Sequence, residues 1–186
     1  MKMKTNYVFF ADGFEEVEAL TCVDVLRRAG MPVKTVSINE GLEAIGAHGV
    51  TIVADSQYGD DDYADAEWLV LPGGMPGATN LAAHEALCRD LIDHYAQGGR
   101  VAAICASPSV VLAPLGILDG RHAVCYPGME APIPEVQWGG ESVAVSDNVV
   151  TGNGPAAAAA FALELVRQVQ GPDVASQVAA GMLLNL

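Results

Sequence analysis

The chain has 186 residues, of which 51% are hydrophobic and 17% are charged, a composition typical of a globular protein. Nine Lys and Arg residues against 23 Asp and Glu residues give a formal net charge of −14, which argues against nucleic acid or an anionic membrane surface as a partner. No uninterrupted apolar stretch is long enough to span a membrane. The N-terminal residues lack the apolar core and cleavage site of a signal peptide, so we expect a cytoplasmic protein with a single domain over residues 1–186.

Strand-like and helix-like segments alternate along the chain. Short apolar runs predict strands, and apolar residues at helical spacing, several times ended by glycine, predict helices. Strands are expected at residues 7–11, 33–38, 50–54 (at an edge), 68–71, 100–104, 123–126, 142–145 and 149–151, and helices at residues 15–29, 84–97, 106–113, 155–168 and 173–184. Near-continuous apolar strands that alternate with helices predict an α/β fold, with a mostly parallel sheet covered by helices on both faces.

Three loops of such a sheet are expected to meet. In open α/β sheets, ligands bind outside the carboxyl ends of the strands. Loops leave such ends at residues 12–14, at Gly73 and Gly74, and at Cys105. We therefore expect one site that combines carboxylates from the start of the first helix, a glycine pair and a thiol.

Cys105 is the first candidate for a catalytic residue. It stands between the apolar strand at 100–104 and residues 106–113, which read as the start of a helix. A cysteine at such a strand-to-helix corner, a nucleophile elbow, is presented to substrate, and the unpaired N–H groups of the first helical turn favour its thiolate. The alternative is a small core residue, since free cysteines are often buried.

The other three cysteines are Cys22, Cys88 and Cys125. The chain has no C-x-x-C pair and no cluster of cysteine and histidine with zinc-ligand spacing, so we expect free thiols and no bound metal. Cys22 and Cys88 lie in helical patterns and are expected to be packing residues. Cys125 lies in a strand-like run with no helix start behind it, which makes it a weaker candidate for reactivity than Cys105.

Three glutamates stand at the start of the first helix. Glu15 and Glu16 are expected on a solvated face, where acidic side chains complement the helix dipole. Glu18 differs because apolar Val17 and Ala19 flank it. Near a thiolate in a dry pocket its pKa would rise, and the protonated carboxyl could donate a hydrogen bond to sulfur and transfer a proton during turnover. Glu18 is therefore the second candidate catalytic residue.

Gly73 and Gly74 follow the strand at 68–71. Glycine is a usual loop residue after a strand, and this is the structural alternative. The functional interpretation is an oxyanion hole, in which the N–H groups of Gly73, Gly74 and Ala106 donate hydrogen bonds to an oxygen of the bound substrate. Neither a phosphate-binding loop nor a dinucleotide-binding glycine motif is present.

As a set, these motifs resemble those of the ThiJ/PfpI superfamily, most of all the branch of the Parkinson-disease protein deglycase and its bacterial relatives. The segments that carry the resemblance, in the family's order, are residues 11–18 (ADGFEEVE), 24–30 (DVLRRAG), 71–74 (LPGG), 103–108 (AICASP) and 151–155 (TGNGP). The resemblance implies a flavodoxin-like three-layer sandwich with Cys105 at the elbow. It also implies that a protonated Glu18 is hydrogen-bonded to the sulfur, and that the protein is a homodimer without a cofactor.

The resemblance implies an activity as well. Members are credited with glyoxalase activity on small 2-oxoaldehydes, with deglycase repair of early glycation adducts, with peroxide sensing and with chaperone-like behaviour. We expect a cysteine-dependent enzyme of the glyoxalase or deglycase type, which converts a 2-oxoaldehyde to a 2-hydroxy acid. The alternative is a redox-sensing or chaperone-like stress protein without turnover, in which Cys105 is oxidised to sulfinic acid.

Other branches of the superfamily fit the sequence less well. The peptidase branch has a histidine directly after the elbow cysteine, where this chain has Ala106. Related amidotransferases have a late His-x-Glu pair, and no histidine follows His122 in this chain. We therefore rank proteolysis and glutamine hydrolysis low.

The chain departs from the family's pattern at Tyr126. Several relatives have a histidine before a proline at this place, as a candidate base, and here Tyr126 precedes Pro127. A phenol with a pKa of about 10 is a poor base near neutrality, but it can donate a hydrogen bond. His48, in a turn, is expected either to approach a site, in its own or a partner subunit, or to be a solvated loop residue. The other histidines are expected to be a packing residue (His122) and two surface residues (His84 and His94).

Overall fold

The computed structural model describes residues 3–184, and its central element is a seven-stranded sheet with the order β10-β11-β7-β6-β1-β2-β5. Neighbouring strands are parallel except for β10, which is antiparallel to β11 at one edge. The strands of this sheet are β1 (Asn6–Phe10), β2 (Val33–Ser37), β5 (Ser56–Gln57), β6 (Trp68–Leu71), β7 (Arg100–Ile104), β10 (Val143–Ser146) and β11 (Val149–Gly152). Two small two-stranded sheets join β3 (Glu43–Ile45) to β4 (Thr51–Val53) and β8 (His122–Ala123) to β9 (Gln137–Trp138).

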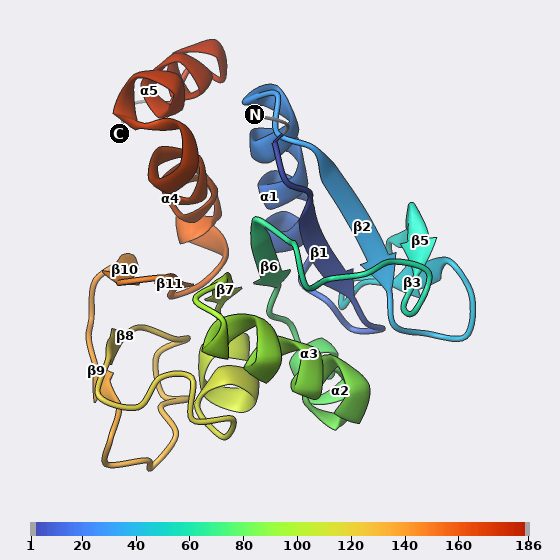
Figure 1. Ribbon diagram of the computed structural model, residues 1–186, viewed down its shortest axis with the longest axis vertical. Helices are drawn as coiled ribbons and strands as arrows, with labels where there is room; N and C mark the ends of the chain where they lie inside the picture. Colours follow the sequence, from blue (N-terminus) through green and yellow to red (C-terminus); the bar gives the residue numbers. More distant parts are fainter. Residues whose placement is uncertain (1–2, 185–186) are drawn as a thin grey trace.

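Helices cover both faces of the sheet (Figure 1). They are α1 (Glu16–Arg28), α2 (Gly77–Ala83), α3 (Glu85–Ala96), α4 (Ala158–Gln170) and α5 (Pro172–Gly181). On one face, α1 packs against α4 and α4 against α5. The other face carries α2, α3 and a π-helical segment, Pro108–Leu112.

Each face has its own hydrophobic core, because successive strand residues point to opposite sides. In β1, Val8 and Phe10 belong to the core under α1 and α4, whereas Phe9 belongs to the core under α2 and α3. The strands in the middle of the sheet are buried throughout, as a parallel sheet with two covered faces requires. The predicted α/β architecture is therefore confirmed.

Several short elements differ from the sequence prediction. The edge strand predicted at 50–54 is β4, which pairs with β3 in a separate hairpin and not with the main sheet. β3, β5 and β9 were not predicted, because strands of two or three partly polar residues carry no periodic signal. Gly77–Ala83 forms α2 directly after the predicted loop, and the helix predicted at 106–113 contains the π-helical segment.

Helix α1 buries a different face from the predicted one. Val17 and Leu20 follow the helical spacing of apolar residues that predicts this helix, but both side chains are exposed. The buried stripe instead contains Glu18, Ala19 and Cys22, which α4 and the sheet cover. The consequence is that a carboxyl group lies inside the protein at the start of α1.

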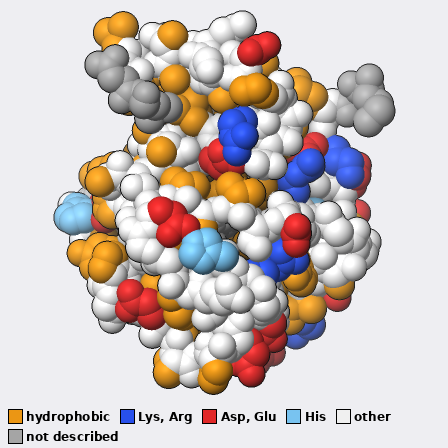
Figure 2. Space-filling view, turned by 90° about the vertical axis from the view of Figure 1, so that its left-hand side faces the viewer, with side chains coloured by type: hydrophobic (Ala, Val, Ile, Leu, Met, Phe, Trp, Pro, Cys, Tyr) orange, Lys and Arg blue, Asp and Glu red, His pale blue; other side chains and the backbone are white. Residues whose placement is uncertain are grey.

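In the view of Figure 2, Lys and Arg side chains lie mainly toward the right, with acidic side chains beside them. Acidic side chains are scattered over this side. Within residues 3–184, no helix combines the length and the apolar character that crossing a membrane requires.

Candidate active site

Cys105 follows the last residue of β7 and has a left-handed backbone, with φ of 64°. This conformation is rare for a residue with a Cβ and persists only where surrounding contacts impose it. Here the Cys105 N–H donates to the Gly152 carbonyl (2.9 Å), and the Cys105 carbonyl accepts from the Tyr126 N–H (2.8 Å). The elbow is thus held by the end of β11 and by the segment after β8, and the Cys105 residue is 8% exposed.

Glu18 and Cys105 meet over the backbone of Gly73. Glu18 Oε2 accepts a hydrogen bond of 2.8 Å from the Gly73 N–H. A Cβ built on Gly73 would lie 2.5 Å from the Cys105 Cβ and 2.7 Å from Glu18 Oε2, so both side chains are against this glycine. Glu18 is 1% exposed, and among the described residues its Oε1 has no nitrogen or oxygen partner. That oxygen is available for the hydrogen bond with the Cys105 thiol.

The two groups change each other's ionisation. Burial raises the pKa of Glu18 to about 7, although the hydrogen bonds from Cys105 and Gly73 oppose this rise. Burial, followed by the charge and hydrogen bond of Glu18, raises the pKa of Cys105 to about 12. Between these two values the pair holds one proton.

This arrangement corrects the expectation of a low-pKa thiolate at Cys105. The segment that begins at Pro108 is a π-helix of only five residues, so its dipole is short and lowers the pKa of the thiol little. Burial next to a carboxyl raises this pKa by more. A thiol with such a pKa is nucleophilic only after it has lost its proton, and the carboxyl beside it, Glu18, has its pKa raised to about 7.

Two backbone N–H groups are directed at the sulfur. Hydrogen bonds from the N–H groups of Gly74 and Ala106 act to lower the pKa of the Cys105 thiol. Backbone N–H groups in this position can stabilise negative charge at or beside the sulfur. The prediction for Gly73 is wrong in this respect, because its N–H is already donated to Glu18. Gly73 is instead the residue that lets the two side chains approach each other.

We expect Gly73→Ala to destabilise the protein by about 1–3 kcal/mol, as overpacking of a full site does. The new Cβ would collide with Cys105 and Glu18 and would lie 2.9 Å from the Ile104 carbonyl oxygen, which is backbone and moves little. Denaturant unfolding measures the effect. Gly140→Ala is the matched control, because a Cβ at Gly140 meets no atom within 4 Å. Equal stability of the two variants would contradict the geometry.

Glu15 and Glu16 are not on a solvated face, contrary to prediction, since their side chains are only 12% and 11% exposed. Glu16 accepts hydrogen bonds from the His48 N–H (2.8 Å) and the Val50 N–H (3.4 Å), and Glu16 Oε2 lies 2.8 Å from His48 Nδ1. The hydrogen bond with Glu16 raises the pKa of His48. This cluster ties the β3–β4 hairpin to the start of α1.

The same three side chains have the geometry of a small ligand set. One ligand atom from each of Glu15, Glu16 and His48 lies within 4.8 Å of the others. The Glu16 oxygens, however, already accept N–H groups from the hairpin, and His48 directs Nδ1 at Glu16. We assign these residues a structural role. His48 itself is an exposed turn residue held by its own chain.

The remaining histidines differ from their predicted positions. His94 is buried, not on the surface, and burial lowers its pKa. His122 is exposed and pairs with Glu141, so it is not a packing residue. His84 is partly buried, and its Nδ1 accepts from the Leu87 N–H (3.1 Å) at the start of α3.

All four cysteines are free, as expected. Cys22 and Cys125 are buried, and burial raises the pKa of each thiol to about 12. Cys88 is partly exposed, and burial raises its pKa as well. Of the four thiols, only that of Cys105 has a buried carboxyl as its hydrogen-bonding partner in residues 3–184.

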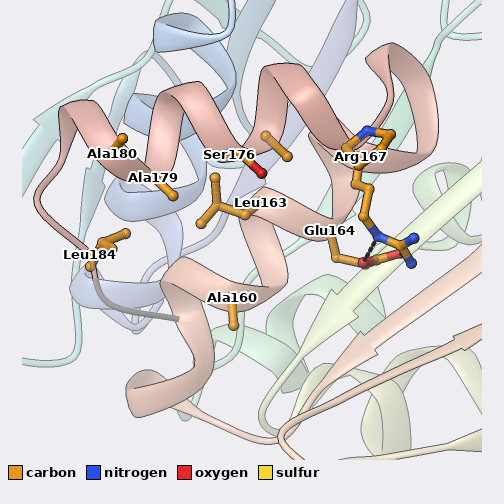
Figure 3. A pocket seen from close by; sticks show the side chains of 10 residues that line it. Ala160, Leu163, Glu164, Arg167, Ser176, Ala179, Ala180 and Leu184 are labelled. Carbon is orange, nitrogen blue, oxygen red and sulfur yellow. Dashed lines mark hydrogen bonds and ion pairs between the residues drawn. The ribbon is translucent and has the colours of Figure 1, made fainter.

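A cavity of about 480 Å³ lies away from these residues, between α4 and α5 (Figure 3). Its walls are mostly apolar, and the ion pair of Arg167 with Glu164 (2.6 Å) lies on one side. The residues that line it are Ala160, Leu163, Glu164, Arg167, Pro172, Ala175, Ser176, Ala179, Ala180 and Leu184. Neither a cysteine nor a histidine lies among them.

The structure defines the protein as one with a flavodoxin-like sheet and a buried cysteine, paired with a carboxyl, at a strand-to-helix elbow. Comparison with known proteins identifies the family. The chain belongs to the DJ-1/PfpI family, whose profile matches residues 4–168. The Parkinson disease protein 7 homolog of Danio rerio is 33% identical over 190 residues, which cover 100% of both chains. A glutathione-independent glyoxalase of Caenorhabditis elegans is 33% identical over 162 residues, which cover 86% of this chain and 84% of that protein.

The solved structures agree. Toxoplasma gondii DJ-1, in an oxidized form, is 36% identical with a TM-score of 0.92, covering 98% of this chain and 100% of that one. Drosophila melanogaster DJ-1beta is 31% identical with a TM-score of 0.93, covering 100% of both chains. The predicted flavodoxin-like fold is confirmed. The chain spans only 40% and 47% of two Arabidopsis thaliana DJ-1 homologs, B and A, which are 33% identical over the matched 94% and 98% of this chain.

Proposed function

We propose that the protein is a cofactor-free enzyme of the glyoxalase type, which converts small 2-oxoaldehydes to 2-hydroxy acids. The observation that carries this proposal is the buried pair of Cys105 and Glu18, which lies beside the N–H groups of Gly74 and Ala106. A nucleophile, a proton-transfer group and oxyanion donors are the parts that addition to an aldehyde needs. The similarity to a glutathione-independent glyoxalase supports the same reaction class.

The reaction follows from this arrangement. Glu18 takes the thiol proton while sulfur adds to the aldehyde carbon, and the oxygen is held by the two N–H groups as it becomes the hydroxyl of a hemithioacetal. Glu18 gives the thiol proton to that oxygen, and the ionised carboxylate then removes the hydrogen from this carbon as a proton. The hydroxyl proton moves to the oxygen of the neighbouring carbonyl and Glu18 returns a proton to the carbon of that carbonyl, which gives the thioester of a 2-hydroxy acid. The first carbon is oxidised and the second reduced, so no external oxidant or reductant is required. Water hydrolyses the thioester, releases the 2-hydroxy acid and restores the thiol.

The test is to incubate purified protein with methylglyoxal in D₂O, without added thiol or metal, and to follow lactate by proton NMR. Proton transfer through Glu18 predicts lactate with deuterium at carbon 2, because the carboxyl exchanges with solvent. Lactate that retains hydrogen at carbon 2 would contradict the role of Glu18. No lactate above the level of protein-free buffer would contradict the function.

A second candidate function is redox sensing through Cys105, which the oxidized form of a related DJ-1 favours. A Glu18 carboxyl can hydrogen-bond to a sulfinic acid on that sulfur. Mass spectrometry after mild peroxide treatment tests it. Selective addition of two oxygen atoms at Cys105 would support sensing, whereas equal oxidation of Cys88, whose thiol is also partly accessible, would count against it.

We further propose a homodimer that uses the exposed apolar side chains of α1 and the β3–β4 hairpin. Exposed large hydrophobic residues are concentrated on these two neighbouring elements, which Glu16 and His48 tie together. They are Val17, Leu20, Ile45, Val50 and Val53. Apolar patches of this kind mark protein–protein contacts.

We expect Val53→Asp to convert the dimer to a monomer, because it places a charge on the most exposed of these five side chains. Sedimentation velocity at micromolar concentration measures the mass. Ile92→Asp is the control, since Ile92 is an exposed hydrophobic residue on α3, across the sheet from α1. A wild-type monomer, or a dimer that survives Val53→Asp, would refute this interface.

A further inference from the structure

We propose that a cavity beside Cys105, with the Tyr126 ring as one wall, receives the substituent of the 2-oxoaldehyde and selects aromatic substituents over methyl. This inference rests on the proposed function and deepens it, because it names the class of substrate. It also gives a role to the tyrosine that departs from the family's pattern.

The cavity has a volume of about 350 Å³, which is within the range of about 300–1,000 Å³ common for small-molecule sites. It lies outside the carboxyl ends of β7 and β11, which are adjacent parallel strands. Its residues come from two segments far apart in the sequence: Tyr126, Pro127, Asn153, Gly154, Pro155 and Ala156.

Both segments are joined to the elbow by backbone hydrogen bonds. The Tyr126 N–H donates to the Cys105 carbonyl (2.8 Å), and the Cys105 N–H donates to the carbonyl of Gly152, the last residue of β11 before Asn153. Both walls of the cavity are therefore attached to the backbone of the elbow residue. A carbonyl compound bound to the Cys105 sulfur would direct its substituent toward these walls.

The walls have the chemistry of a site for a flat, uncharged group. No residue that lines the cavity carries a charge. Two proline rings, Pro127 and Pro155, contribute apolar surface, and the Tyr126 side chain is part of a residue that is 47% exposed. The Tyr126 ring lies over Gly154, because a Cβ on this glycine would be 3.4 Å from the ring carbon Cδ2. One side of the ring is thus against backbone, and an aromatic ligand can pack on the exposed part.

The site is formed before a ligand arrives. The Tyr126 carbonyl accepts from the Met129 N–H (3.0 Å), and the Gly154 carbonyl accepts from the Ala157 N–H (2.9 Å). The Asn153 N–H donates to the Ser142 carbonyl (3.0 Å), which fixes the start of the second segment. Walls held in this way lose little freedom when they bind, which favours selectivity.

The first experiment compares kcat/KM for phenylglyoxal and methylglyoxal. We expect the ratio to favour phenylglyoxal in the wild type and to fall about three- to tenfold in Tyr126→Ala, the range of one aromatic contact. Tyr126→Phe, which keeps the ring, should preserve the ratio, and Ile92→Ala on α3 is a control far from the cavity. The same ratio in the wild type and Tyr126→Ala would overturn the proposal.

The second experiment needs no turnover. Mandelate and lactate, the products expected from the two substrates, are titrated into the Cys105→Ala protein with and without Tyr126→Ala, and binding is followed by NMR. Tighter binding of mandelate that disappears with Tyr126→Ala supports the cavity, even if the wild type turns over neither aldehyde, in which case only the proposed function fails. Turnover of both aldehydes, with equal binding of the two acids, refutes the cavity and leaves the proposed function intact.

Discussion

Replacing Cys105 with alanine is expected to lower kcat/KM for methylglyoxal by at least about 10⁴-fold, because the variant has no atom that can form the hemithioacetal. The remaining groups, the N–H donors of Gly74 and Ala106, can still polarise a carbonyl but cannot attack it. Glu18→Gln should cost about 10²- to 10⁴-fold, the usual contribution of a proton-transfer group. Initial rates of methylglyoxal loss and lactate formation measure both effects.

Cys88→Ala is the matched control for this experiment. Cys88 is a free thiol on α3, partly exposed and remote from the Glu18 carboxyl, so its loss should leave the rate unchanged. A scavenging reaction of exposed thiols with the aldehyde would instead be reduced by Cys88→Ala. Cys105→Ala protein that still forms lactate would refute the mechanism.

Glu18→Gln is expected to stabilise the protein at pH 8 by up to about 3 kcal/mol, although it removes activity. The Glu18 carboxyl has an ordinary pKa of 4.5, and burial raises it to about 7 in the folded protein. The folded state thus prefers the protonated carboxyl. Its contribution to stability is complete below about pH 4.5 and is lost as the pH rises through 7. Glutamine is neutral at every pH, and its amide can accept from Gly73 and donate to sulfur as the protonated acid does.

Denaturant unfolding of the wild type and Glu18→Gln at pH 5 and pH 8 measures this prediction. The two proteins should differ little at pH 5 and most at pH 8. Other groups that titrate in this window, such as buried His94 with its lowered pKa, are present in both proteins and cancel in the difference. Cys105 does not interfere, since burial raises its pKa to about 12, far above the window. An equal difference in stability at both pH values would contradict a raised pKa at Glu18.

Much of the fold can be predicted from local sequence. The apolar runs that form β6 and β7 are bounded by loop residues, and Gly171 stands between α4 and α5, so these elements are encoded by neighbouring residues. The elbow at Cys105 follows from the same information, because a strand end and a following turn are both local. Even the meeting of the loops at Gly73 and Cys105 follows from one rule about parallel sheets.

Other features depend on what packs on each element. The sequence of α1 allows either the face with Val17 and Leu20 or the face with Glu18 to be buried, and contact with α4 and the sheet buries Glu18. The pKa of Cys105 depends in the same way on burial and on a carboxyl that is distant in the sequence. A prediction from the residues around Cys105 takes the start of the helix into account, but not the burial and the carboxyl group that raise the pKa of the thiol.

The order of the longer strands and helices, and the positions of Cys105 and the glycines near it, can be read from the sequence, because hydrophobic periodicity and turn residues act over a few positions. Three features appear only in the folded chain: the burial of Glu18 next to Cys105, the close approach of both side chains to Gly73, and the cavity lined by Tyr126 and the residues after β11. The physical reason is that desolvation, close approach and cavities arise between segments that are far apart along the chain and meet only when the sheet has formed.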